Sequence, residues 1–199
     1  ASICMFGPRE TMIALFYLAI LFLCQSHAIL FENNEGNSGM DFPDAKKVMA
    51  SLKKTYMFQS LIKSPKVQCV YQIFYNATVQ RYGYKLKYDK VTLIKGGGFL
   101  NNPLYIRDVV NSTIYLSSNP GFPKEPTQME ILYSDFKSCM VTKGPHLKYF
   151  PRACRLWLTD SSFANPSTNC KNGFIRHCEF PPYTYTYNIT GCVDLDKHY

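Results

Sequence analysis

From residue 56 onward the chain alternates apolar and polar residues with period two, which is the pattern of half-buried β-strands. The alternation is strictest over residues 81–88, where tyrosine and leucine occupy the even positions. Other segments with strand character are 56–62, 67–79, 91–94, 104–116 (broken near Asp108), 127–136, 138–142 and 155–159. Glycine, proline and asparagine separate several of them. We therefore expect about eight short strands connected by turns.

Two segments have helical spacing instead. Asp41 or Asp44 can cap a short helix that ends near Leu52. Near the C-terminus, Cys170, Phe174 and Cys178 recur every four residues and would share one face of a helix over 166–178. The tail, 183–193, is expected to be extended. A mostly-β fold, an up-and-down barrel or less favourably a sandwich, fits this order of elements, and a barrel of about eight strands can hold one small ligand.

The start of the chain has the features of a secretory signal peptide. Residues 12–23 are almost all apolar, and Ser26-His27-Ala28 follows as a small-x-small cleavage pattern. The apolar run is short for a bilayer span of about 20 residues, so cleavage is favoured over a membrane anchor. We expect residues 1–28 to be the signal peptide, with 1–4 preceding the true start at Met5. The mature protein would be one secreted domain, 29–199.

Six cysteines follow residue 28, and an even number in a secreted chain predicts up to three disulfides. No Cys-x-x-Cys pair is present, so we expect no metal site. Three N-x-[ST] sequons predict glycosylation at Asn76, Asn111 and Asn188.

The net charge of +8 suits an anionic ligand, a glycan or an acidic surface, and it also serves solubility. The lysines are scattered rather than clustered, which argues against a nucleic-acid partner. Neither G-x-S-x-G nor H-E-x-x-H is present. His146, His177 and His198 form no pattern that suggests acid–base catalysis. We expect a binding protein that is neither an enzyme nor dependent on a cofactor.

Four short motifs together resemble the tick salivary lipocalins of the histamine-binding protein family. They are D-A-K-K-V-M at 44–49, Y-S-D-F-K-S-C at 133–139, L-W at 156–157, and P-x-x-x-C-x-x-x-F-x-x-x-C at 166–178. Their order and spacing extend the resemblance over nearly all of 29–199. It implies an eight-stranded antiparallel lipocalin barrel with a short N-terminal helix and a C-terminal helix tied to the barrel by disulfides. The implied pairs are Cys69–Cys192 and Cys139–Cys170, which leaves Cys154 and Cys178 as the third.

The resemblance also implies a small host mediator as ligand, by default a biogenic amine such as histamine or serotonin. Amine-binding relatives carry glutamate two residues before the tryptophan of the last strand, whereas here Arg155 precedes Trp157. Arginine repels an ammonium and pairs with a carboxylate, so an anionic lipid such as a leukotriene or a fatty acid is the alternative. Arg155 could instead stack on Trp157 as a structural plug. The outer surface could also bind a host complement or haemostasis protein.

The remaining candidate ligand contacts are inferred from strand alternation. If Asn76 carries a glycan outside, the opposite face of its strand, with Tyr71 and Tyr75, points inward. The aromatic candidates are Tyr71, Tyr75, Tyr82, Tyr84, Tyr88, Tyr133 and Trp157. For most of the first five, taken individually, ordinary barrel core is the favoured alternative. The acidic candidates are Asp108 and Asp135, with an exposed strand end as the alternative for Asp135. We expect the protein to be a monomer.

Overall fold

The computed structural model describes residues 39–61, 64–75, 87–118, 127–144, 154–178 and 184–195. The predicted signal peptide, residues 81–86 of the strand predicted over 81–88, Asn76, Tyr82 and Tyr84 lie outside these ranges. Among the residues that are described, no helix is long and apolar enough to cross a membrane.

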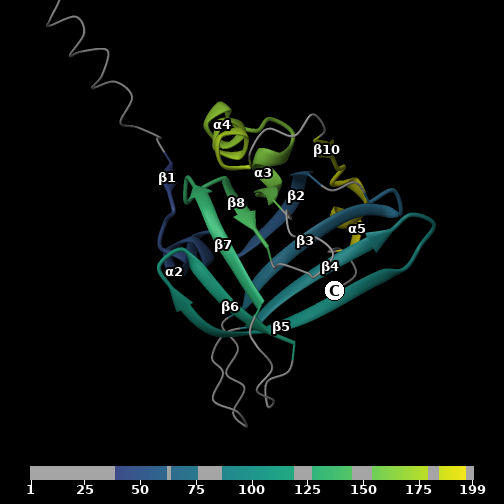
Figure 1. Cartoon of the computed structure of the whole chain (residues 1–199). Helices are drawn as coiled ribbons and strands as arrows, with labels where there is room; N and C mark the ends of the chain where they lie inside the picture. Colours follow the sequence, from purple (N-terminus) through teal and green to yellow (C-terminus); the bar gives the residue numbers. More distant parts are fainter. Residues whose placement is uncertain are drawn as a thin grey trace, which may run out of the picture. The chain divides into compact units, whose positions relative to one another are not determined.

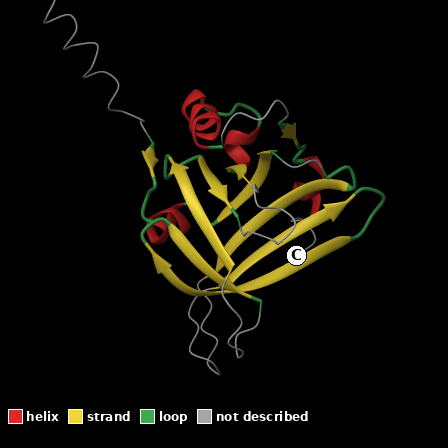
Figure 2. Cartoon of the chain, viewed as in Figure 1, coloured by secondary structure: helices red, strands yellow, loops and turns green. Residues whose placement is uncertain are grey.

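Within the described ranges, eight strands form one closed antiparallel barrel (Figures 1 and 2). They are β2 (Lys54–Ser60), β3 (Val67–Tyr75), β4 (Lys87–Ile94), β5 (Phe99–Val110), β6 (Thr113–Ser117), β7 (Thr127–Ser134), β8 (Cys139–Lys143) and β9 (Cys154–Leu158). Their order is β7-β6-β5-β4-β3-β2-β9-β8, and pairing of β7 with β8 closes the ring. Two further short strands pair with strands of the barrel, β1 (Met40–Asp41) with β7 and β10 (Tyr185–Thr186) with β2. The predicted eight-stranded barrel is confirmed.

Helix α2 (Ala45–Ser51) begins at Asp44, whose carboxylate accepts a hydrogen bond from the Lys46 backbone N–H at 2.8 Å. Its buried residues join the hydrophobic cluster inside the barrel, so it covers one end. Helix α4 (Thr168–His177) lies outside the barrel wall, with Ser167 as its N-cap. Two short helices were not predicted, α3 (Asp160–Phe163) and α5 (Thr190–Leu195). The expectation of a fully extended tail is therefore wrong beyond residue 189.

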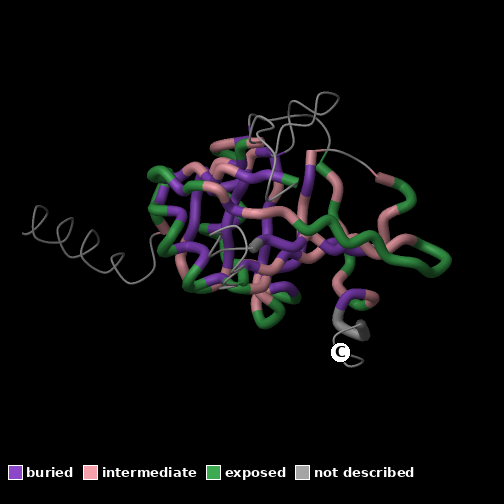
Figure 3. The backbone as a smooth tube through the Cα atoms, turned by 90° about the horizontal axis from the view of Figure 1, so that it is seen from below, coloured by how far each residue is buried: buried purple, intermediate pink, exposed green. Residues whose placement is uncertain are grey.

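Two hydrophobic clusters lie on opposite sides of the barrel wall. The inner cluster fills the barrel and includes Val70, Phe74, Tyr88, Met140 and Trp157. The outer cluster lies between the wall and the helices α3, α4 and α5, and it includes the six disulfide cysteines with Tyr133 and Phe174. Figure 3 shows the buried positions gathered in the compact part of the tube and the exposed positions mainly in turns and projecting loops.

Three disulfides join the C-terminal part of the chain to the barrel wall. Cys69 on β3 pairs with Cys192 on α5, Cys139 on β8 with Cys170 on α4, and Cys154 on β9 with Cys178 at the end of α4. These are the pairs expected from the sequence. By restricting the unfolded chain, each can stabilise the fold by about 2–4 kcal/mol.

The predicted strand over 104–116 is in fact two strands, which turn at Asn111 and Ser112 rather than at Asp108. A bulge between Ile106 and Asp108 shifts the alternation by one residue. Val109 therefore lies in the inner cluster, whereas Val110 faces outward and is 47% exposed. The separate strands predicted at 81–88 and 91–94 are continuous through Asp89 and Lys90 in β4.

Helix α4 approaches the wall closely where Gly173 meets Tyr133. A Cβ atom at Gly173 would lie 2.6 Å from the Tyr133 ring, and one at Gly39 would lie 2.2 Å from the Tyr133 hydroxyl oxygen. Tyr133 is 3% exposed and has little room to move. The aromatic ring thus fits between two positions that both require glycine.

We predict that Gly173→Ala destabilises the protein by about 1–3 kcal/mol, because overpacking at the Tyr133 ring outweighs the better helix propensity of alanine. Urea unfolding measures this loss. Asn172→Ala, on the exposed side of the same helix, is the matched control and should leave stability unchanged or slightly raised. On a Tyr133→Leu background the cost of Gly173→Ala should fall by more than half; an equal cost on both backgrounds would disprove the steric explanation.

Candidate functional site

Contacts across the barrel identify its inner face. Gln72 Nε2 on β3 lies 3.7 Å from Met140 Sδ on β8, although β2 and β9 separate these strands in the sheet. The same amide nitrogen donates to Thr55 Oγ1 at 3.1 Å, and the Tyr88 hydroxyl donates to Gln72 Oε1 at 3.0 Å. All four residues are buried. The barrel centre is therefore a polar network within an apolar core.

Arg155 and Trp157 share the inner face of β9. Trp157 is 1% exposed, belongs to the inner cluster, and donates Nε1–H to Thr142 Oγ1 at 2.8 Å. Arg155 is half-buried and donates Nη1–H to the Gly144 carbonyl oxygen at 2.8 Å. Burial lowers the pKa of Arg155, and the Tyr88 and Tyr187 hydroxyls oppose that shift. A guanidinium stays charged at neutral pH in spite of such a shift.

Lys90 is a second cation on the inner face, and it was not among the residues predicted from the sequence. It lies on β4 two residues beyond Tyr88 and pairs with Gln72 across the sheet. It is half-buried, and in the part of the chain that the structure describes no hydrogen bond or ion pair holds its ammonium. Burial, and then the positive charge of Arg155, lowers the pKa of Lys90 to about 8. Continuing the alternation past Tyr88 would have found it.

No carboxylate lies on the inner face of the described barrel strands. Asp89 alternates with the inward Tyr88 and Lys90, and Glu130 alternates with Met129 and Ile131 of the inner cluster, so both face outward. The interior therefore offers positive charge without an acidic partner from the strands.

The prediction that Tyr71 and Tyr75 point inward is wrong, because Gln72 and Phe74 occupy the inner face of β3. Tyr71 is half-buried outside, with its ring centroid 6.0 Å from that of Tyr56. Tyr75 is 39% exposed. Cys69 lies on the same face of β3 as Tyr71 and Tyr75, and its disulfide partner Cys192 lies outside the barrel. A disulfide to the C-terminal segment therefore indicates an outward face, and it outweighs the inference drawn from glycosylation of Asn76.

Tyr75 does line a pocket of about 770 Å³ at the α2 end of the barrel. Met49 and Phe74 form apolar parts of its wall, and Lys46 and Lys53 contribute positive charge. The Phe74 ring packs on Tyr88, with centroids 5.3 Å apart. Arg155 and Trp157 are not among its lining residues.

Asp108 and Tyr133 are also misassigned. Asp108 is exposed and accepts a hydrogen bond from the Val109 N–H at 2.8 Å, because the bulge after Ile106 turns it outward. Tyr133 follows a second bulge, between Ile131 and Tyr133, and belongs to the outer cluster. Neither faces the barrel interior.

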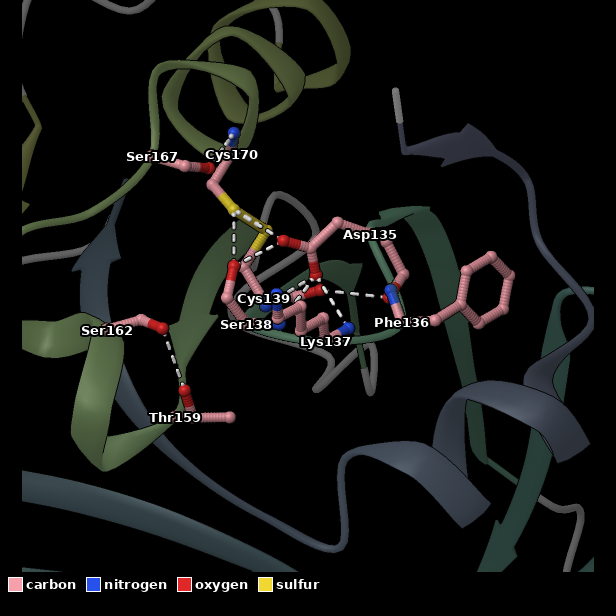
Figure 4. Close-up of a disulfide and its surroundings, with 10 residues drawn as sticks. Asp135, Phe136, Lys137, Ser138, Cys139, Thr159, Ser162, Ser167 and Cys170 are labelled. Atoms are coloured by element: carbon pink, nitrogen blue, oxygen red, sulfur yellow. Dashed lines mark hydrogen bonds between the residues drawn. A yellow bond between two sulfur atoms is a disulfide. The ribbon is translucent and has the colours of Figure 1, made fainter. Parts of the chain in front are cut away.

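Asp135 organises the turn between β7 and β8 rather than facing a ligand (Figure 4). Its Oδ1 accepts hydrogen bonds from the backbone N–H groups of Lys137 at 3.0 Å, Ser138 at 2.7 Å and Cys139 at 2.9 Å. The Ser138 hydroxyl donates to its Oδ2. Burial alone would raise the pKa of Asp135, but the hydrogen bonds, led by that from the Ser138 side chain, outweigh burial and hold it below the usual value.

Asp135, Cys139 and Cys170 place potential metal-ligating atoms within 4.8 Å of one another. Both sulfur atoms are joined in a disulfide, so neither is a thiolate that could bind a metal ion. The grouping is part of the anchor between α4 and the barrel.

A closed eight-stranded antiparallel barrel with a helix at one end and a second helix on its wall defines a lipocalin-type binding protein. The family model described as tick histamine binding protein matches residues 35–194, and the chain belongs to this family. None of the curated proteins matches the chain.

Two solved structures are similar to the chain. The major allergen Per a 4 from cockroaches has 12% identity and a TM-score of 0.55, with 78% of this chain and 94% of the allergen covered. Japanin from Rhipicephalus appendiculatus, bound to cholesterol, has 13% identity and a TM-score of 0.48, with 68% of this chain and 93% of Japanin covered. At this identity, the allergen shows a shared fold and no more.

We predict that Asp135→Asn lowers the free energy of unfolding by about 1–2 kcal/mol at neutral pH, because charge-assisted hydrogen bonds to the turn are weakened. Since the folded pKa of Asp135 is lowered, its contribution is complete above the unfolded value of about 4 and is lost as pH falls through the folded value. The difference in the free energy of unfolding between the wild type and Asp135→Asn should therefore narrow as pH falls below about 4. Asp160→Asn, at an exposed carboxylate, is the control. If that difference did not depend on pH, the stabilising role assigned to the ionised Asp135 carboxylate would be contradicted.

Proposed function

We propose that the protein is a secreted salivary lipocalin that sequesters a small anionic amphiphile in its barrel. The observation that carries this proposal is the pair of inward cations, Lys90 and Arg155, without an inward carboxylate on the described strands. Three disulfides support an extracellular setting. Asn111 and Asn188 are exposed, which suits the proposed glycosylation there.

The chemistry of the interior favours a carboxylate. Two like charges in a partly desolvated space are costly unless an anion compensates them. Arg155 can pair with a carboxylate bidentately, and Lys90 can add a point charge. Apolar residues of the inner cluster, such as Val70 and Met140, would contact a hydrocarbon chain. A fatty acid or a leukotriene combines these two chemistries.

An amine is the ligand in the family's name, but the described interior disfavours one. Histamine and serotonin are cations at neutral pH and would meet Lys90 and Arg155 without an inward carboxylate from the strands. Neither Asp108 nor Asp135, the acidic candidates from the sequence, supplies one. Binding of a host protein through the outer surface is the alternative if the barrel takes no small molecule.

We predict that decanoate and leukotriene bind with measurable heat in calorimetric titration, and that histamine and serotonin do not. Arg155→Gln and Lys90→Gln should each weaken decanoate binding about tenfold or more, the equivalent of one charge-assisted hydrogen bond. Lys171→Gln removes an exposed lysine on α4 and should bind like the wild type. Tight histamine binding would restore the amine assignment. No heat with any ligand would favour a protein partner.

Affinity for the anion should also depend on pH through Lys90. Its pKa of about 8 would rise when an anion binds beside it, so binding takes up a proton wherever the amine is partly neutral. Decanoate affinity should be constant below pH about 7 and fall as pH rises through 8, by up to about tenfold per unit. Titrations at pH 6.5 and 9.5 measure this, and Lys90→Gln should flatten the dependence. An equal slope in that variant would assign the effect to another group.

A further inference from the structure

We propose that the turn of the β4–β5 hairpin docks on an anionic lipid surface, with Phe99 and Leu100 entering the interface of the bilayer. This is a second interaction of the protein, and it does not rest on the proposed binding of a ligand inside the barrel. The docking surface, the hairpin tip, consists of Lys66, Lys95, the glycines at 96–98, Phe99 and Leu100.

Two large apolar side chains are exposed on opposite faces of the hairpin. Phe99 pairs with Leu93, and the two share a face, because paired residues of neighbouring strands lie side by side. Leu93 packs against the outer cluster. Leu100 pairs with Thr92 on the opposite face. Phe99 is nevertheless 53% exposed and Leu100 55%, because the turn between β4 and β5 projects from the barrel (Figure 1). Water therefore contacts apolar surface on both sides of one projecting turn.

The turn leaves room for a medium that surrounds it. Gly96, Gly97 and Gly98 have φ angles of 90°, 97° and 100°, which residues with side chains rarely adopt. A Cβ atom built at any of the three would meet no described atom within 4 Å. The Ile94 N–H donates to the Gly98 carbonyl oxygen at 3.0 Å, so a hydrogen bond closes the turn. The hairpin tip is thus a narrow projection of defined shape.

Two lysines flank the apolar pair. Lys66 and Lys95 are exposed, and the Lys95 backbone N–H donates to the Lys66 carbonyl oxygen at 2.9 Å, which holds the two residues side by side. In the described part of the chain no carboxylate forms an ion pair with either lysine. The carboxylates of the hairpin, Asp89 and Asp108, lie about 20 Å or more from the turn along their strands. The hairpin tip therefore combines positive charge with apolar surface.

The segment that contains the hairpin tip has a large excess of positive charge. Residues 45–107, which include β2, β3, β4 and most of β5, contain twelve lysines and arginines and one acidic residue, Asp89. The other parts of the chain contain ten basic and thirteen acidic residues. The net charge of +8 therefore comes from this segment alone. An anionic lipid surface attracts such charge over a Debye length of about 10 Å at 0.1 M salt.

A bilayer suits this combination better than a protein surface does. A protein surface would cover one face of the hairpin, whereas the interface of a bilayer surrounds an inserted turn and contacts both Phe99 and Leu100. Apolar side chains enter the boundary between headgroups and acyl chains to a depth of about 5–10 Å, and lysines beside them are attracted to anionic headgroups. At that depth the polar backbone of the glycine turn stays hydrated.

The test uses the native, disulfide-bonded protein and vesicles of phosphatidylcholine with or without about 30% phosphatidylserine. Sedimentation at millimolar lipid should show binding only to the vesicles that contain phosphatidylserine, and about 0.5 M salt should abolish it. Lys95→Gln should weaken partitioning about fivefold. Phe99→Ser combined with Leu100→Ser should weaken it about tenfold or more. Lys171→Gln and Ile175→Ser change an exposed lysine and an exposed apolar residue of α4, and these matched controls should bind like the wild type.

Tryptophan fluorescence separates insertion from adsorption to the lipid surface. Phe99→Trp places an indole in the hairpin tip, while the native Trp157 is 1% exposed and gives a constant background. The emission of Phe99→Trp should shift to shorter wavelength with phosphatidylserine vesicles, and that of Ile175→Trp should not. Absence of this shift, or undiminished binding after Phe99→Ser with Leu100→Ser, would overturn the proposal. Absence of any vesicle binding would also overturn it, and would favour a protein as the partner of the hairpin.

Failure of this proposal can be told apart from failure of the proposed ligand site. Phe99→Ser with Leu100→Ser should leave the affinity for decanoate unchanged, because neither residue belongs to the proposed anion site. Arg155→Gln should leave vesicle binding nearly unchanged, since Arg155 lies inside the barrel. Loss of vesicle binding in Arg155→Gln would show that the barrel takes up a lipid from the vesicles, and it would contradict docking through the hairpin tip.

Discussion

Closure of the barrel is the constraint on which the rest of the structure depends. Because β7 pairs with β8, every residue of the eight strands faces either the interior or the outside. The inner positions of β3, β4 and β9 form the polar centre, with Gln72, Lys90 and Arg155. The outer positions of β7, β8 and β9 form the surface on which α4 packs, and two disulfides hold that helix there.

Most of the fold could be predicted from the sequence. Period-two alternation located the strands, the i, i+4, i+8 spacing of Cys170, Phe174 and Cys178 located the second main helix, and the family resemblance supplied the barrel and the disulfide pairs. The short helices α3 and α5 were missed, since four and six residues carry too little periodic signal.

The candidate site was predicted less well, for a specific physical reason. The bulges after Ile106 and Ile131 each add a residue, which reverses the face on which the next residues of the strand lie, and no residue type marks them in the sequence. They moved Asp108 and Tyr133 to the outside. Arg155 and Trp157 follow no such bulge in β9, and both face the interior. Lys90 was missed because the strands predicted from the sequence ended at residue 88 and began again at residue 91, whereas β4 is continuous through Lys90.

The proposed recognition of the ligand's negative charge by the barrel is tested most directly by comparing decanoate with decanol. Both have the same chain length, but only decanoate can pair with Arg155 and Lys90. A charge-assisted contact is worth about 1.5–3 kcal/mol, so decanoate should bind at least about tenfold more tightly at pH 7. Equal affinities, or tighter binding of decanol, would show that the two cations do not select the ligand.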